Sequence, residues 1–493
     1  MLPAWIEAAE DSAIQRAVVK VLSKSRPINL SAPWRRSTPN SVSGSGVIIA
    51  PGRVLTNAHV VINSAELNLQ PFESSDEIPA KVVSLGAGID LAILEFDQSS
   101  ALGTVKPLNF VDTMPEIRST VRVYGYPAGG DSQSVTEGII SRVEHALYRF
   151  GSQGLRMQID APVNSGNSGG PAMVGGQIAG LTFSIRPGAN SIGYVIPVEE
   201  IKIFMQDIED GKYDGKPNLR VDYQFLENDA LRKKLGIPEG LTGALCQGVR
   251  DQDNSALKAG DVVTKVANVK VDNRGNCKAD NGVTYVFSRL AQEIAKDNKV
   301  EMTVWRDGNE HTISVSVDTR RKLVEYLAGR TPRYYVYGPL VLSEACADFM
   351  DVIESGLADE NSKQRSGSAS IVATMRLGQS PLLGYRFTRR SDDSRDIVVL
   401  TQLLTHETSR GYRPIPYPFT VKAIDGIAIT NLTQAAKLLR EGNSPYVELE
   451  FFDLIAEKIV LDRKKLLAAT DTILEENGIV RRASNDLMIS QEN

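Results

Sequence analysis

Residues Ser43–Val61 read SGSGVIIAPGRVLTNAHVV, two short apolar runs on either side of a Pro-Gly turn. Runs of this kind, rich in β-branched residues and bounded by Gly, Pro, Asn or Ser, are typical of β-strands. The same texture extends from Ala17 to about Pro197, in AVVKVL, AKVVSL, DLAILEF, STVRVYGYP, LRMQIDAPV, QIAGLTFSI and IGYVIPV. Many short strands at such spacing predict an all-β barrel or sandwich.

Helical pattern in this part of the chain is confined to its edges, at Ala8–Val19 and Val198–Glu209. The next stretch, DGKYDGKPNLRVD (Asp210–Asp222), is polar and rich in Gly and Pro, so we interpret it as a linker. At roughly 150 residues per domain, a chain of 493 residues predicts about three domains. We place them at residues 1–209, 219–318 and 319–493.

The two later domains are both predicted to mix strands with helices. The second contains GALCQGV, DVVTKVANVKV, VEMTVWRDG and HTISVSVD around the helical segment YVFSRLAQEIAKD. The third contains IVATMRLG, DIVVLTQLL, FTVKAIDGIAITN and YVELEFF, with helical TQAAKLLREG and a helical tail from Arg463 to Glu476. An internal repeat links them, because VTKVANVKVDN (Val263–Asn273) aligns without a gap with VKAIDGIAITN (Val421–Asn431). Asn268 falls on Gly426, which favours a tight turn between two strands.

The composition is that of an ordinary globular protein, with 42% hydrophobic and 23% charged residues. The formal net charge of -5 lacks the basic excess that phosphate neutralisation needs, so nucleic acid is not an expected partner. Three cysteines, Cys246, Cys277 and Cys346, form neither a disulfide framework nor a metal-ligand spacing, and we interpret them as small apolar residues. No stretch approaches the roughly 18 apolar residues of a membrane span.

The first residues, MLPAWIEAAEDSAIQRAVVKV, have early acidic side chains and lack the basic flank, apolar run and cleavage site of a signal peptide. This pattern predicts an intracellular, cytoplasmic protein. A periplasmic or organellar location stays open, because a chain whose leader had been removed would look the same.

The motif GNSGGP, residues 166–171, places Ser168 in a glycine-lined tight turn. Absent Cβ atoms let the backbone of such a turn approach a substrate carbonyl closely. We therefore predict that Ser168 is a nucleophile. Gly166, Asn167 and Ser168 form the predicted oxyanion hole, with the N–H groups of Gly166 and Ser168 as its donors.

A histidine and an aspartate upstream complete the chemistry of acyl transfer. TNAHVV puts His59 at the end of an apolar strand, and IDLAILEF puts Asp90 at the start of the next apolar run. A serine nucleophile needs an imidazole to take its proton and a carboxylate to fix the imidazole tautomer. The order His, Asp, Ser is that of chymotrypsin-like enzymes and differs from the α/β-hydrolase order. The glycine-rich SGSG stretch (Ser43–Gly46) is not a phosphate loop, since a continuous strand follows it.

These motifs together resemble the HtrA/Deg family of serine proteases, over the whole chain. The resemblance is strongest over SGSGVIIAPGRVLTNAHVV, DLAILEF, VRVYGYPAGGDSQSVTEGIISRVE, QIDAPVNSGNSGGPA and IGYVIP. PRYYVYGPLVLSEA (Pro332–Ala345) and the terminal IVRRASNDLMI resemble the plant-type branch, whose last domain is PDZ-like and structural. The resemblance implies a mainly β fold, in which a chymotrypsin-like double β-barrel protease domain precedes two α+β PDZ-like domains.

The resemblance also implies an activity and an assembly. We expect an ATP-independent serine endopeptidase of protein quality control that degrades unfolded or damaged proteins without metal or other cofactor. His59 is the implied base, Asp90 the orienting acid and Ser168 the nucleophile. A homotrimer or homohexamer is implied, and Trp34 is interpreted as either a subunit contact or a domain anchor. The rival hypothesis from another class is a holdase or PDZ adaptor with little proteolytic turnover.

Substrate-binding residues are also implied by the chymotrypsin-like fold. The base of the S1 pocket falls on Pro162, and Ile192 is expected to line and shorten it, which predicts an apolar pocket. For the PDZ domain we predict that Leu235, Gly236 and Ile237 form the loop that holds a peptide C-terminus. We find no such loop in the third domain and expect a packing or oligomer role there.

Overall fold

The computed structural model describes residues 4–127, 130, 132–148, 153–185, 193–217, 219–250, 255–279, 282–317, 322–349, 379–385, 388, 390 and 395–488. The chain divides into two compact units. The first unit consists of Met1–Ser25 with Asn40–Thr319, and the second consists of Arg26–Pro39 with Arg320–Asn493. Within the described residues, no helix has the length and apolar character needed to cross a membrane.

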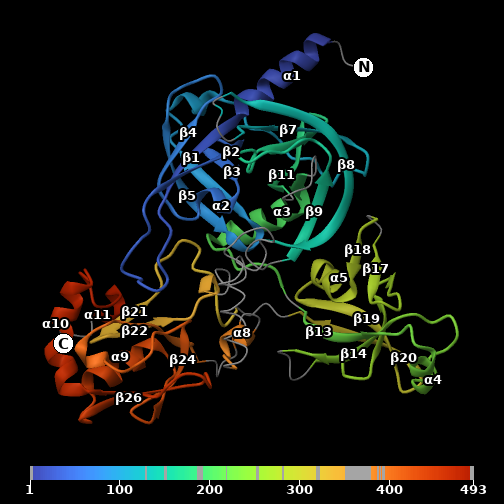
Figure 1. Cartoon of the computed structure of the whole chain (residues 1–493). Coiled ribbons are helices and arrows are strands. Elements are labelled where there is room, and N and C mark those ends of the chain that lie inside the picture. Colours follow the sequence, from blue (N-terminus) through green and yellow to red (C-terminus); the bar gives the residue numbers. More distant parts are fainter. Residues whose placement is uncertain are drawn as a thin grey trace. The chain divides into compact units, whose positions relative to one another are not determined.

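Six antiparallel strands close the first barrel, which we call the N-barrel, in the order β1-β2-β3-β6-β5-β4 (blue in Figure 1). Alternate side chains fill its interior, among them the fully buried Val21, Val54 and Leu94. Its strands are β1 (Val18–Ser25), β2 (Asn40–Ala50), β3 (Arg53–Thr56), β4 (Ser64–Gln70), β5 (Ile78–Gly86) and β6 (Leu91–Phe96).

A second closed barrel of six strands, the C-barrel, follows in the order β10-β11-β12-β9-β8-β7. Val121, Met157 and Val195 are fully buried inside it. Its strands are β7 (Thr120–Gly125), β8 (Ser134–Leu147), β9 (Gln153–Ile159), β10 (Pro171–Val174), β11 (Gln177–Ile185) and β12 (Gly193–Pro197). Two closed six-stranded barrels confirm the predicted chymotrypsin-like, mainly β fold.

Helices flank the barrels where the sequence predicts them. Helix α1 (Ala4–Ala17) precedes β1 and starts before the predicted Ala8. Helix α3 (Val198–Asp207) follows β12 and buries Ile201 and Phe204. The short helices between strands are α2 (Ala58–Val61), η1 (Ala87–Ile89), η2 (Ala101–Thr104) and η3 (Ile208–Asp210).

The rest of the first unit is an α+β sheet, which we call the first module, with the order β13-β14-β15-β19-β20 and β16 paired to β15. Helix α5 packs against it with Phe287 and Leu290 buried. Its elements are β13 (Val221–Phe225), α4 (Asp229–Lys234), β14 (Ala244–Val249), β15 (Val262–Val266), β16 (Val269–Lys270), β17 (Asn276–Lys278), β18 (Thr284–Val286), α5 (Phe287–Ile294), β19 (Lys299–Arg306) and β20 (Asn309–Ser316).

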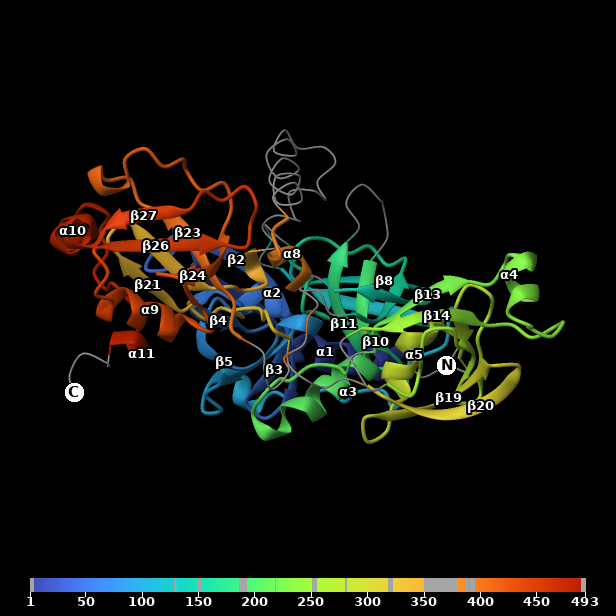
Figure 2. The same ribbon diagram turned by 90° about the horizontal axis from the view of Figure 1, so that it is seen from below.

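The second unit is built on a sheet in the order β21-β22-β23-β24-β26-β27, with β25 paired to β24 (orange and red in Figure 2). Helices α9 and α10 bury Leu432, Leu439 and Leu466 against its strands. Its elements are β21 (Tyr334–Tyr337), β22 (Leu340–Glu344), α8 (Leu382–Tyr385), β23 (Val398–Leu403), η4 (Glu407–Ser409), β24 (Phe419–Ile424), β25 (Ile427–Ala428), α9 (Leu432–Glu441), β26 (Tyr446–Phe451), β27 (Ile459–Asp462), α10 (Arg463–Glu476) and α11 (Asn485–Met488). The predicted strand IVATMRLG, residues 371–378, lies outside the described residues.

The internal repeat corresponds to the same hairpin in both sheets. Val266 pairs with Val269 between β15 and β16, and Ile424 pairs with Ile427 between β24 and β25, at aligned positions of the repeat. The backbone turns with a positive φ of 48° at Ala267 and of 50° at the aligned Asp425. The repeat therefore equates β15 of the first module with β24 of the second unit.

Residues Arg26–Pro39 connect two strands of the N-barrel, yet they belong to the second unit. The ring of Trp34 lies 6.0 Å from the ring of Tyr334, beside buried Val336 and Ile473. The guanidinium of Arg35 donates to the carbonyl oxygen of Asn477. Of the two interpretations of Trp34, the structure supports the domain anchor.

Candidate active site

His59 and Asp90 meet at one end of the N-barrel because strands β3 and β6 are antiparallel neighbours. The residues that follow β3 therefore lie beside those that precede β6. Nδ1 of His59 lies 2.7 Å from Oδ2 of Asp90, and the backbone N–H of His59 donates to Oδ1 of Asp90 at 2.8 Å. A carboxylate only accepts hydrogen bonds, so Nδ1 carries the proton and Nε2 is left unprotonated.

The backbone of Asp90 is held as firmly as its carboxylate. Its φ of 60° lies in the left-handed region, which is uncommon for a residue other than glycine. The carbonyl oxygen of Asp90 accepts from Asn57 Nδ2 at 2.9 Å and from the N–H of Ala58 at 3.2 Å. Asn57 is fully buried, and sequence analysis did not assign it a role. Its position two residues before His59 in TNAH was the only signal available.

The loop between β9 and β10, residues 160–170, contains the candidate nucleophile Ser168, and we call it the nucleophile loop. It needs its glycines for two different reasons. Gly166 has a φ of 97° and Gly169 a φ of 87°. A Cβ on Gly169 would also lie 2.1 Å from the carbonyl oxygen of Ser45, which no side chain tolerates. The loop therefore folds tightly against β2 of the N-barrel, which brings Ser168 to the edge of that barrel.

The hydrogen bonds of this loop distinguish the predicted oxyanion donors from one another. The N–H of Asn167 donates to the carbonyl oxygen of Asn164 at 3.1 Å, so it is already used within the turn. In the described part of the chain, the N–H groups of Gly166 and Ser168 donate to no protein acceptor. An oxyanion hole requires unused donors, and these two N–H groups are available for that role.

Gly44 marks where the two barrels bring the catalytic candidates together. A Cβ built on Gly44 would lie 2.8 Å from Cγ2 of Val60 and 3.1 Å from the carbonyl oxygen of Ser168. Val60 follows His59 directly in helix α2, so Gly44 lies between the side chain next to His59 and the backbone of Ser168. The absence of a side chain at Gly44 keeps this approach possible.

Of the two predicted S1 residues, the structure describes Pro162 but not Ile192. Pro162 is described and exposed, and its carbonyl oxygen accepts from the Thr136 hydroxyl at 2.9 Å. Ile192 lies outside the described residues. No group of three His, Cys, Asp or Glu side chains among the described residues is arranged to hold a metal ion.

The structure argues against the predicted carboxylate loop at Leu235, Gly236 and Ile237. These residues form the C-terminal cap of helix α4, where the three N–H groups donate to the carbonyl oxygens of Leu231, Lys233 and Arg232 respectively. A peptide carboxylate needs free N–H groups, and these three are used in ending a helix. The Leu-Gly pair marks the end of helix α4 and not a ligand loop.

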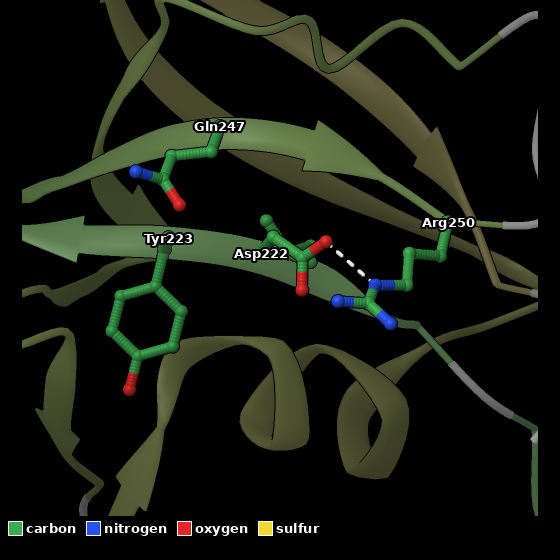
Figure 3. Close-up of a pocket in the computed structure, with 5 residues that line it drawn as sticks. Asp222, Tyr223, Gln247 and Arg250 are labelled. Carbon is green, nitrogen blue, oxygen red and sulfur yellow. Dashed lines mark hydrogen bonds and ion pairs between the residues drawn. The ribbon is translucent and has the colours of Figure 1, made fainter. Parts of the chain in front are cut away.

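One edge of the first module's sheet, opposite the edge formed by β20, is β13. This strand pairs with β14 alone among the described strands. Figure 3 shows Asp222 of β13 paired with Arg250, at 2.6 Å, beside a pocket that Tyr223 and Gln247 also line. The Tyr223 ring lies 5.2 Å from the ring of Phe287, the first residue of α5. An extended peptide can add to a strand edge of this kind.

The equivalent edge in the second unit is already occupied. By the repeat, β22 takes the place of β13, and β22 pairs on its outer side with β21. Strand β21 is in turn bridged by the chain near its C-terminus, where the N–H of Val336 donates to the carbonyl oxygen of Arg482 at 2.7 Å. Because the chain itself covers this edge, strand addition has no free place there, and the packing or oligomer role of this domain stays a prediction.

A second buried carboxylate, Glu200 of α3, lies where the C-barrel meets the first module. Its Oε1 accepts from the N–H of Leu155 at 2.7 Å and from Nζ of Lys216 at 2.6 Å. Lys216 also donates to Glu293 of α5 at 2.8 Å, and Nε2 of His145 lies 3.6 Å from the same carboxylate. Burial, with the nearby charge of Glu293, raises the pKa of Glu200 to about 7.

Comparison with known proteins agrees with this architecture. Residues 44–181 match the family described as a trypsin-like peptidase domain, and residues 324–486 match a PDZ domain. The Arabidopsis thaliana protein "Putative protease Do-like 3, mitochondrial" is 30% identical over 483 residues, which cover 97% of this chain and 81% of the relative. "Protease Do-like 2, chloroplastic" from the same plant is 30% identical over 486 residues, 97% of this chain and 76% of the relative. Among solved structures, the HtrA-type protease AlgW with a tripeptide has a TM-score of 0.47 and 24% identity, covering 64% of this chain and 97% of that one.

Proposed function

Because this chain belongs to the Do-like, HtrA/Deg family of serine proteases, we propose that it is an ATP-independent endopeptidase that degrades unfolded or damaged proteins. The observation that carries the proposal is the His59–Asp90 pair at 2.7 Å beside a loop whose Gly166 and Ser168 N–H groups are unused.

In the proposed mechanism, His59 Nε2 takes the proton of the Ser168 hydroxyl as its oxygen attacks the scissile carbonyl. The carbonyl oxygen becomes an oxyanion against the N–H groups of Gly166 and Ser168. Asp90 stabilises the imidazolium, and His59 then protonates the leaving amine. Water attacks the acyl-enzyme by the same route, with His59 again as the base, and releases the second product.

The test is fluorophosphonate labelling together with cleavage of unfolded casein by the full chain. We expect labelling in the wild type and loss of both signals in Ser168→Ala. Ser41→Ala, an exposed serine on β2, is the matched control and should keep both. Cleavage that persists in Ser168→Ala, with contaminants excluded, would refute the mechanism. A wild type that binds casein without cutting it would favour the holdase or adaptor alternative.

We also propose that the enzyme prefers small or branched apolar residues at P1. Pro162 at the predicted base of the pocket carries no charge, so no carboxylate at this position awaits a Lys or Arg side chain. Mass spectrometry of casein fragments should show cleavage after Val, Ile, Ala or Leu. A product map dominated by cleavage after Lys and Arg would overturn this assignment.

For partners, we propose that peptide C-termini add to the open edge of β13 and that the chain assembles as a homotrimer or homohexamer. The support for peptide binding is the side of β13 that pairs with no other described strand, and the support for assembly is family membership. Light scattering of the purified chain tests the assembly, and a monomer at micromolar concentration would refute it. The named locations of the two relatives lead us to propose an organelle as its compartment.

A further inference from the structure

Ser45 on β2 has no exposed surface, and all of its polar atoms are engaged around the nucleophile loop. Its backbone N–H donates to the carbonyl oxygen of Ser168 at 2.8 Å. Its hydroxyl donates to the carbonyl oxygen of Gly166 at 2.9 Å and accepts from the N–H of Tyr126 at 2.8 Å. Its own carbonyl oxygen accepts from the Thr56 hydroxyl at 2.7 Å. This serine lies in the SGSG stretch, for which the mechanism so far has no use.

These contacts fix the peptide group between Gly166 and Asn167 from both of its sides. The Ser45 hydroxyl holds its carbonyl oxygen, and the carbonyl oxygen of Asn164 holds its N–H. A planar peptide group that is held at both ends cannot rotate without breaking a buried hydrogen bond. Its orientation sets the direction of the neighbouring N–H groups of Gly166 and Ser168, which are the two unused donors.

The side chain next to Ser168 supplies no charge that could hold the loop in place. Asn167 is almost fully buried and uncharged, and its Oδ1 has no hydrogen-bond partner in the described part of the chain. An ion pair to this side chain therefore cannot order the loop. The link from Ser45 also crosses between barrels, because β2 belongs to the N-barrel and the loop lies between strands of the C-barrel.

We infer that Ser45 is a positioning residue for the oxyanion hole: its hydroxyl, fixed in the N-barrel, locks the Gly166 carbonyl so that the Gly166 and Ser168 N–H groups face the reacting carbonyl. The inference rests on the proposed role of Ser168. It assigns the hydroxyl no contact with substrate, so its effect falls on the transition state and not on substrate affinity.

The test compares Ser45→Ala with Ser23→Ala in the full chain, using casein and a fluorogenic peptide with an apolar P1 residue. Ser23 is the matched control because it is a buried serine of the same barrel whose hydroxyl has no hydrogen-bond partner among the described residues. Rates are normalised to folded protein. Ser45→Ala should lower kcat about 10- to 100-fold with KM within about twofold, less than the loss of an oxyanion donor itself. Ser23→Ala should keep wild-type kcat.

Two further readouts separate positioning from a general structural role. A peptide boronic acid, whose tetrahedral adduct places an oxygen in the oxyanion hole, should bind Ser45→Ala about 10- to 100-fold more weakly than wild type. The acid limb of the kcat/KM profile should not move, since the contact between His59 and Asp90 is untouched. Loss confined to KM, or equal boronate affinity in the two proteins, would overturn the inference.

Ser45→Cys covers the case in which the alanine variant fails to fold. The thiol fills the site but is a weak donor, so its kcat should lie between those of wild type and Ser45→Ala, and at least several-fold below wild type. Wild-type kcat in a folded Ser45→Cys or Ser45→Ala protein sinks this inference alone. A wild-type chain that neither reacts with fluorophosphonate nor cleaves casein sinks the proposed function, and this inference with it.

Discussion

Asp90 and Glu200 are two carboxylates of the first unit that are buried to nearly the same extent, with 2% and 0% of their surface exposed. Both oxygens of Asp90 receive hydrogen bonds, one from the His59 backbone and one from its ring. In Glu200 a single oxygen accepts both hydrogen bonds, and Oε2 has no partner among the described residues. Burial penalises the charge in both places, but only at Asp90 do donors reach both oxygens.

The two carboxylates differ in the role that we propose for them. Asp90 orients a histidine, whereas Glu200 stabilises the contact between two parts of the first unit, which we call its fastening role. In the proposed mechanism Asp90 fixes the tautomer of His59, which requires one particular geometry of the two side chains. Glu200 of α3, which follows the C-barrel, forms an ion pair with Lys216 in the linker. Lys216 forms a second ion pair with Glu293 of α5 in the first module. Equal burial therefore predicts neither the same role nor the same sensitivity to substitution, and the two sites can be separated by activity and by stability.

The largest expected effects are on activity, at the His59–Asp90 pair. Asp90→Asn should lower kcat/KM by about 10⁴-fold, because an amide can turn its NH₂ group toward His59 and select the wrong tautomer. The free energy of unfolding should change far less than the activity does. Peptide hydrolysis and urea unfolding measure the two, with Glu200→Gln as the control that retains at least a third of the activity. More than a tenth of wild-type activity in Asp90→Asn would contradict the orienting role.

The largest expected effect on stability is at Lys216. Lys216→Met leaves Glu200 and Glu293 without the ammonium that contacts both, and breaking a buried pair in this way costs about 3–5 kcal/mol. Lys212→Met is the matched control in the same linker, because Lys212 pairs with Asp214 in an exposed position, where the cost is about 0–1 kcal/mol. Urea unfolding at pH 8 compares them. Equal destabilisation by the two variants would refute the fastening role.

The pH dependence at Glu200 should be smaller. Its folded pKa of about 7 lies above the ordinary value of 4.5, so the folded state holds this proton more tightly than the unfolded state. That contribution to stability is complete below about pH 4.5 and is lost as the pH rises through 7. Glu200→Gln does not titrate, so its free energy of unfolding should gain about 1–3 kcal/mol relative to wild type between pH 5 and 8. If the free energies of unfolding of the two proteins ran parallel with pH, or if that of the variant fell relative to wild type, the raised pKa of Glu200 would be contradicted.

The smallest effect should be at the second histidine. Like His59, His145 lies near a carboxylate, here that of Glu293. The distance from His145 Nε2 to Glu293 Oε1 is 3.6 Å, and Nε2 forms no hydrogen bond among the described residues. His145→Ala should change kcat/KM less than about threefold and cost about 1 kcal/mol of stability. His59→Ala should lower kcat/KM by at least about 10⁴-fold. If the two alanine variants lost similar activity, the separation between the two carboxylate sites would fail.

Local pattern in the sequence was sufficient to predict those elements whose structure is set by residues close together in the chain. The short apolar runs predicted a barrel or sandwich, the aligned turn residues predicted the repeated hairpin, and helix α10 has the predicted bounds Arg463–Glu476. The same approach failed at Leu235–Ile237, because a helix cap and a ligand loop share the same residue types. Only the hydrogen-bond partners of the three N–H groups distinguish them.

The sequence by itself determined the fold class, the identity of His59, Asp90 and Ser168 as candidates, and the composition of the nucleophile turn. Only the tertiary structure decided the partners of buried polar groups. The Ser45 hydroxyl bonds to a carbonyl 121 residues away, and Lys216 joins two carboxylates that lie 16 residues before it and 77 after it. The physical reason is that periodicity records which side chains face the core, whereas a buried donor is satisfied by any acceptor that packing brings within reach.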